Sequence, residues 1–385
     1  MKTIDKNVIM LGWVSFFTDM ASAMIHPILP IFVVAVLHEG VDKLGVIVAV
    51  STFVSYALRL LSGYISDRYG IVKPLVVGGY AFSALSKPLI GLTHGYQGIA
   101  GLQALERLGK GLRSAPKDLM IVQYSKENAS GKTFGFHKMM DIAGELSGAL
   151  ILFGLLLFFG QSEAVIRNIF YATLIPGIIG LVIVVFFVSD VPKPKAILKQ
   201  SFALTQNDKK TIGSLFFYFL FVLFIFSDSF FTMQAKGVGI SIAMIPLLFV
   251  VSTGVQTVSS YIFGVWIDQF GVKRILAFSY ICGVAAQGFL YLESPIFTWV
   301  AYVFLGLFTV TSLNANRTII AQSADNKGSV YGIFYAGIAL FGAFGAYISG
   351  VIWEHFGMHF ALAFSFFGTL GLAVIFILLR LRREN

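Results

Sequence analysis

Long apolar runs, separated by short polar breaks, follow one another along the whole sequence. A helix needs about 20 mainly apolar residues to cross roughly 30 Å of hydrocarbon, and the runs reach that length. With 57% hydrophobic and only 12% charged residues, the chain cannot coat a soluble domain with charge. The sequence therefore predicts an all-α membrane protein with twelve transmembrane helices, near residues 8–37, 44–66, 74–93, 97–121, 133–159, 165–188, 211–235, 241–267, 273–292, 296–321, 329–353 and 358–380.

The basic residues fall mainly on one set of connections between these runs. The opposite set carries little beyond Lys43, Arg167 and Lys236. Because cytoplasmic loops are enriched in Lys and Arg, we expect a multi-pass protein of the inner membrane with both termini in the cytoplasm. The net charge of +9 is spread over these connections rather than gathered on one surface, so no nucleic-acid partner is expected.

The chain divides into two related halves. Residues 189–210 form the longest polar segment, and Pro192 and Pro194 stop helix propagation there. The phrase "GYISDRYGIVK" (residues 63–73) returns as "GVWIDQFGVKR" (residues 264–274), at matching places in the two halves. We therefore expect two pseudo-symmetric six-helix bundles, residues 1–188 and 211–385, joined by a cytoplasmic linker at 189–210, an organisation typical of transporters.

These two phrases resemble the loop motif of the major facilitator superfamily. Two further stretches, "RLGKGLRSAPKDLMI" (residues 107–121) and "FGFHKMMDIAGELSGA" (residues 134–149), resemble motifs of a bacterial branch of that superfamily. The resemblance implies the major facilitator fold, in which two bundles rock about a central cavity. In such a fold the two loop phrases act as a cytoplasmic latch, whose expected residues are Gly63, Asp67, Arg68, Gly70, Lys73, Asp118, Gly264, Asp268, Gly271 and Arg274. The alternative for Asp67 is a loop charge at the membrane surface.

Ionised groups deep in apolar runs are costly and mark functional candidates. Asp19 lies near the middle of the first run, Arg107 lies deep in the fourth beside Glu106, and His137, Asp141 and Glu145 share one face of the fifth. We expect the substrate and proton-coupling residues to be Asp19, Arg107, Lys110, Arg113, Asp141, Glu145 and Asp228.

Each of these residues also has a structural interpretation. Asp19 can be an inert hydrogen-bonded residue, Asp141 and Glu145 can be counterions of Arg107 and Lys110, and His137 can be a cap or loop contact. The resemblance adds one point, because Arg107 and Gly111 match the spacing of a fourth-span motif linked in the superfamily to proton transfer.

The function predicted from these features is proton-coupled secondary active transport of a small organic solute by alternating access. Efflux by antiport is the leading direction, and uptake by symport, or exchange, of a small anionic metabolite is the alternative. An apolar cavity lined by Phe16, Phe17, Phe226, Phe230 and Phe231 would favour amphipathic compounds, whereas the basic cluster of the fourth run favours an anion. The expected partners are the solute, protons and lipid, and we expect a monomer that is not an enzyme and holds no cofactor or metal.

Overall fold

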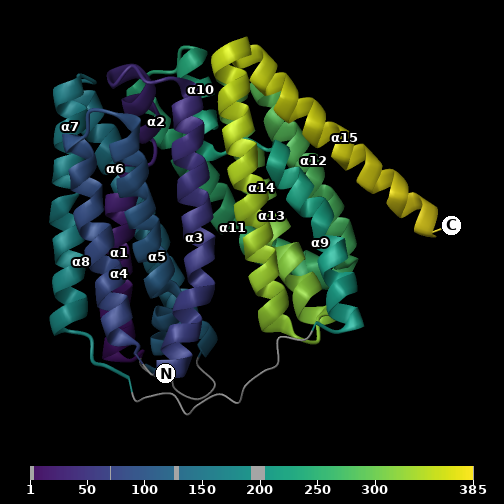
Figure 1. Cartoon of the computed structure of the whole chain (residues 1–385), viewed down its shortest axis with the longest axis horizontal. Helices are drawn as coiled ribbons and strands as arrows, with labels where there is room; N and C mark the ends of the chain where they lie inside the picture. Colours follow the sequence, from purple (N-terminus) through teal and green to yellow (C-terminus); the bar gives the residue numbers. More distant parts are fainter. Residues whose placement is uncertain (1–3, 70, 125–129, 192–203, 385) are drawn as a thin grey trace. The chain divides into compact units, whose positions relative to one another are not determined.

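The computed structural model describes residues 4–69, 71–124, 130–191 and 204–384, without the side chains of residues 56–69, 130–132 and 379–384. These residues are almost entirely helical, and three short π or 3₁₀ segments, η1 (Phe32–Val36), η2 (Ile90–Leu92) and η3 (Ile242–Met244), extend neighbouring α-helices. The α-helices (Figure 1) are α1 (Lys6–Ala23), α2 (Leu29–Ile31), α3 (Val41–Tyr69), α4 (Lys73–Leu89), α5 (Tyr96–Tyr124), α6 (Ser130–Phe159), α7 (Glu163–Ala172), α8 (Leu174–Phe186), α9 (Gln206–Phe224), α10 (Asp228–Gly237), α11 (Ile245–Phe270), α12 (Val272–Tyr291), α13 (Pro295–Ser323), α14 (Lys327–Phe356) and α15 (Met358–Glu384).

Nine helical stretches of the described chain are long and apolar enough to cross a membrane. They make the chain a multi-pass membrane protein and begin at residues 73, 133, 163, 206, 242, 272, 295, 327 and 358. Of the other predicted runs, the first is interrupted after α1, and the fourth coincides with α5, whose charged residues lower its mean hydropathy. The number of twelve spans therefore stays a prediction.

The first helix of each half begins with a cap and breaks part-way. Asp5 caps α1 by accepting a hydrogen bond from the amide of Asn7 at 2.7 Å, and Thr205 and Asp208 form a capping box at the start of α9. Helix α1 ends at Ala23, shortly before Pro27, which has no amide hydrogen to continue a helical ladder. Helix α9 ends at Phe224, and the chain resumes as α10.

The described helices belong to two compact units. Unit 1 comprises residues 1–39 and 50–200, and unit 2 comprises residues 40–49 and 201–385. The start of α3, which the sequence places in the N-terminal half, therefore groups with unit 2. The amide of Val41 donates to Glu354 Oε2 at 2.7 Å. A Cβ at Gly45 would collide with the backbone of Ala346 and Gly350 on α14, so glycine allows α3 and α14 to approach closely here.

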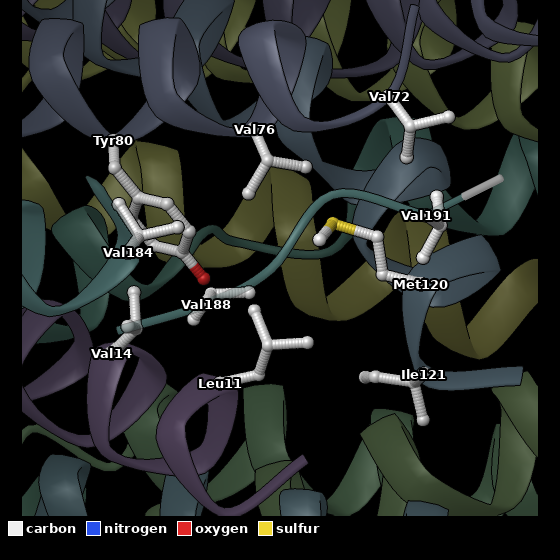
Figure 2. Close-up of a cluster of buried hydrophobic side chains, with 10 residues drawn as sticks. All are labelled: Leu11, Val14, Val72, Val76, Tyr80, Met120, Ile121, Val184, Val188 and Val191. Carbon is white, nitrogen blue, oxygen red and sulfur yellow. The ribbon is translucent and has the colours of Figure 1, made fainter. Parts of the chain in front are cut away.

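Close helix packing in unit 1 depends on glycine at particular positions. On α6, a Cβ added at Gly144 would meet the backbone of Phe16, and one added at Gly148 would meet the backbone of Met20, so α1 and α6 touch through their main chains. At one end of the unit, α1, α4, α5 and α8 enclose an apolar cluster (Figure 2) formed by Leu11, Val14, Val72, Val76, Tyr80, Met120, Ile121, Val184, Val188 and Val191. Burial of these side chains stabilises the packing of the four helices.

Aromatic side chains fill the core of unit 2. Phe226 and Phe230 are buried against Trp353, with ring centroids 6.0 Å apart in both pairs. Phe231 is fully buried with its ring edge-on to Tyr302, at 5.3 Å. The prediction that these three phenylalanines line an open cavity is therefore wrong, because they pack inside unit 2. Phe16 and Phe17 of α1 are only partly buried.

Candidate functional site

Charged side chains are buried between α4 and α5 in unit 1. Glu106 is 3% exposed, and its carboxylate lies 3.3 Å from Arg107 Nε and 3.4 Å from Ser83 Oγ. The Oε2 atom of Glu106 has no hydrogen-bond partner in the described chain. A buried carboxylate is costly unless it is paired. The guanidinium of Arg107, which the sequence predicted as a functional charge, therefore also stabilises Glu106.

Lys87 of α4 is a buried cation that the sequence analysis missed. It is 3% exposed, and its Nζ donates to the carbonyl oxygen of Thr18 on α1 at 3.2 Å. The signal was available, since a lysine lies inside an apolar run next to Pro88. Because Lys87 lies near the end of a predicted span, the sequence alone does not distinguish a surface lysine from one that reaches across to another helix.

Asp19 and Lys110 face the same group of charges. The electrostatic interactions of Lys110 include those with Arg107, Asp19 and Glu106, and Asp19 also acts on Lys87. The structure therefore brings together charged residues of α1, α4 and α5, which we call the unit 1 charge cluster: Asp19, Lys87, Glu106, Arg107 and Lys110.

Arg113 has contacts that differ from those of the unit 1 charge cluster. Its guanidinium carbon lies 4.5 Å from the centroid of the Tyr80 ring, and Nη1 donates to the carbonyl of Gly79 at 3.2 Å. A Cβ at Gly79 would collide with the carbonyl of Gly109, so α4 and α5 are in backbone contact there. Arg113 thus ties α4 to α5 through a cation–π contact and a hydrogen bond.

A second polar group connects α6 to α1. His137 Nε2 lies 2.9 Å from Ser15 Oγ, and His137 Nδ1 lies 3.4 Å from Asp141 Oδ1. Ser15 Oγ is also 3.4 Å from Tyr80 Oη and accepts from Lys117 Nζ at 3.3 Å. We call Ser15, Tyr80, Lys117, His137 and Asp141 the histidine chain.

These contacts bear on the interpretation of Asp141 as a counterion of Arg107. In the described chain, the carboxylate that pairs with Arg107 is Glu106, and Asp141 pairs with His137. Asp141 is therefore not the counterion of Arg107. Glu145, two turns along α6 from His137, interacts electrostatically with Asp19 and Lys110 of the unit 1 charge cluster and with Asp141 of the histidine chain.

Asp228 of unit 2 interacts electrostatically with Tyr302. It is exposed at the first residue of α10. In the described part of unit 2, the only buried charged side chain is Asp208 at the start of α9. It accepts hydrogen bonds from the amides of Asp325 and Asn326 at 2.9 and 3.0 Å, so its charge is used in joining α9 to the connection before α14.

The predicted latch is described only in part. The side chains of Gly63, Asp67 and Arg68, and the whole of Gly70, lie outside the described residues. Lys73 donates from Nζ to the carbonyl of Val185 at 2.9 Å, within unit 1.

In the second copy, Gly271 separates α11 from α12 with φ of 86°, a conformation that favours glycine. Asp268, Arg274 and, in the first half, Asp118 are exposed, and Gly264 has open space where a Cβ would stand. Gly271 therefore stands where the backbone turns between the two helices of the second phrase.

A family model described as Major Facilitator Superfamily matches residues 11–235 and 211–385. The chain belongs to this superfamily of transporters. A relative in Methanocaldococcus jannaschii, the uncharacterized MFS-type transporter MJ1317, is 29% identical over 368 residues, which cover 92% of this chain and 90% of that protein. The multidrug resistance protein MdtH of Citrobacter koseri is 26% identical over 148 residues, or 38% of this chain and 34% of MdtH.

Solved structures share the fold of this superfamily member at low identity. The nucleoside transporter NupG has a TM-score of 0.78 at 13% identity, with 96% of this chain and 98% of that chain covered. A POT family transporter in complex with 5-aminolevulinic acid has a TM-score of 0.80 at 11% identity, with 98% and 96% covered. At these identities the likeness concerns the fold.

Proposed function

We propose that this superfamily member is a proton-coupled secondary active transporter that moves a small organic solute across the inner membrane by alternating access. In this proposal the helical segments form twelve spans in two bundles, residues 1–188 and 211–385, and a monomer with both termini in the cytoplasm is the working unit. The observation that supports the proton coupling is that Asp19 and Glu145 both interact electrostatically with Lys110 of unit 1, and that the His137–Asp141 pair lies on the same helix as Glu145.

The physical basis of coupling is charge balance at a site shielded from water. Proton binding to a carboxylate near the cations of unit 1 removes charge that balances them. The two protonation states therefore favour different arrangements of the helices that carry the charges. Asp19 on α1 and Glu145 on α6 are the carboxylates we assign to this exchange, and the histidine chain supplies a route for the proton along α6.

Export by antiport is the direction that sequence similarity supports. MdtH, a multidrug resistance protein, matches part of the chain. The fifth-span phrase that the family associates with antiport is kept only in part: Gly144 and Gly148 hold its spacing, but Ala149 stands where the phrase has proline, which weakens the case for export. The aromatic argument for export is weaker than the sequence suggested, because Phe226, Phe230 and Phe231 are buried.

Uptake of an anion together with protons is a second candidate, and the buried cations support it. Proton binding to Asp19 would leave Lys87, Arg107 and Lys110 with less compensating charge, which strengthens anion binding. Proton and anion would then bind together, and that is the logic of symport.

Reconstitution into proteoliposomes tests the coupling. A pH gradient imposed across the vesicles is expected to drive solute movement by wild type, and a pH dye inside the vesicles reports the accompanying proton. Asp19→Asn should abolish the coupled flux, whereas Asp42→Asn, which removes a carboxylate paired with its neighbour Lys43, should keep it. Equal, pH-independent flux in wild type and Asp19→Asn would reject proton coupling through this residue.

For the latch, we propose that the two loop phrases stabilise one of the two access states. Asp67→Asn should change the labelling of single cysteines introduced on the two faces of the membrane. The protein suits this assay, because its lone Cys282 is 1% exposed and gives little background. Unchanged labelling on both faces would exclude a latch role for Asp67.

A further inference from the structure

Lys87 is a buried cation whose hydrogen-bonding capacity is not filled. An ammonium group has three N–H donors, and in the described chain the contact of Nζ is the carbonyl oxygen of Thr18 at 3.2 Å. Lys87 takes part in none of the ion pairs of the described residues. Burial of a charge without a close partner is strongly unfavourable, so the site is poised for an anion.

Arg107 offers a second set of unfilled donors. Its Nε pairs with Glu106 at 3.3 Å, although neighbouring residues of a helix do not face each other. The ion pair uses one side of the guanidinium, and the terminal Nη atoms have no contact in the described hydrogen bonds and ion pairs. Two parallel N–H groups of this kind match the two oxygens of a carboxylate or phosphate.

The local charge balance favours an incoming anion. The electrostatic interactions around this cluster involve four cations, Lys87, Arg107, Lys110 and Arg113, and three carboxylates, Asp19, Glu106 and Glu145. Glu106 is already held by Arg107 and Ser83, so it does not neutralise Lys87 fully. One negative group added to this cluster would bring it to neutrality.

We infer that Lys87, Arg107 and Lys110 bind an oxyanion group, a carboxylate or phosphate, of the transported solute. Arg107 supplies the bidentate fork, and the two lysines supply point charges. This inference rests on the proposed transport function, because it names the chemistry of the solute that occupies the same cluster. It differs from a structural role in which Lys87 only ties α4 to α1 through Thr18.

The test is equilibrium binding to the purified full chain, followed as thermal stabilisation without any gradient. The probes are the sodium salts of acetate, succinate and citrate, and inorganic and glycerol phosphate, each compared with sodium chloride at equal ionic strength. We expect saturable stabilisation by one of the two classes, and the class that stabilises distinguishes a carboxylate from a phosphate ligand. Equal, non-saturating effects of all salts would overturn the inference.

Variants assign the binding to the named residues. Lys87→Gln should weaken the apparent affinity by about tenfold or more, the effect of losing one charge-assisted hydrogen bond. Lys43→Gln, which removes a surface lysine that is 39% exposed, is the matched control and should bind as wild type does. Unchanged affinity in Lys87→Gln contradicts the assignment.

If Lys87→Gln does not fold, a second variant, Arg107→Lys, tests the same site. Arg107→Lys keeps the charge but removes the fork, and it should lower the affinity by a similar factor; wild-type affinity in this variant would also contradict the assignment. The result is separable from the proposed function, since anion binding without pH-driven flux would reject proton-coupled transport and keep the site. Proton-driven flux of an uncharged solute, without anion binding, would reject the anion site and keep proton-coupled transport.

Discussion

Ser15 Oγ of α1 lies 2.9 Å from His137 Nε2 of α6, and both side chains are buried. The serine is the member of the histidine chain that meets three other side chains, His137, Tyr80 and Lys117. A hydroxyl that both donates and accepts is suited to passing a proton between neighbours. Replacing Ser15 with alanine therefore interrupts the histidine chain by removing a single oxygen atom.

Ser15→Ala should reduce proton-coupled flux by about tenfold, the size of one lost hydrogen bond of ~1.4 kcal/mol. The measurement is pH-driven flux in proteoliposomes at several external pH values. Ser22→Ala is the control on the same helix, since Ser22 Oγ donates to the carbonyl of Thr18 within its own helix at 3.0 Å. Identical pH profiles for wild type and Ser15→Ala would show that the proton does not pass this hydroxyl.

Glu106→Gln should destabilise the protein, because the substitution leaves Arg107 without its carboxylate in a buried site. Removal of one partner of a buried ion pair costs about 3–5 kcal/mol. The comparison is Glu163→Gln, which opens the exposed pair of Glu163 with Arg167 at 2.8 Å and should cost about 0–1 kcal/mol. Thermal unfolding in detergent measures both, and equal midpoints for the two variants would mean that burial does not strengthen the inner pair.

Run length and charge placement were sufficient to predict where most helices lie. Each of the nine apolar stretches coincides with a predicted run, because the number of apolar residues needed to cross a bilayer is fixed by its thickness. Charged residues inside such runs are rare enough to be conspicuous, so Asp19 and Arg107 could be selected from sequence. Arg107 pairs with its sequence neighbour Glu106, but the contacts between helices, such as that of Lys87 with Thr18, could not be selected, because they depend on helix rotation and tilt.

Lys87 and two phenylalanines, Phe226 before α10 and Phe230 within it, show why other features were missed. A lysine near the end of an apolar run can reach the membrane surface with its long side chain, and only the packing of α4 against α1 shows that Lys87 turns inward. From sequence alone, Phe226 and Phe230 could equally line a cavity or fill a core. Their contacts with Trp353, more than 100 residues away in the chain, decide the matter.

Gly144→Ala should disturb the contact of α1 with α6. A Cβ at this position would fall on the backbone of Phe16, which cannot move aside as a flexible side chain can. We expect a loss of about 1–3 kcal/mol, as for overpacking in a tight core, together with lower coupled flux, because Ser15 and His137 lie across the same interface.

Gly154→Ala on the same helix is the control for Gly144→Ala. Its Cβ would meet nothing within 4 Å, so the change should be neutral or stabilising by up to about 1 kcal/mol through helix propensity. Thermal unfolding and flux should be measured on the same preparations. A Gly144→Ala protein as stable and active as Gly154→Ala would mean that the helices can separate without consequence.

Gly271→Ala tests the turn in the second copy of the repeated phrase. With φ of 86° and ψ of 144°, Gly271 has a backbone conformation that an alanine adopts only with strain, at a cost of about 1–3 kcal/mol. Gly264→Ala lies in the same phrase, within α11, and its Cβ would meet nothing within 4 Å. We expect a lower unfolding midpoint for Gly271→Ala and no loss for Gly264→Ala. Equal unfolding midpoints for the two variants would mean that the α11–α12 turn relaxes at no cost and that backbone geometry does not require glycine at position 271.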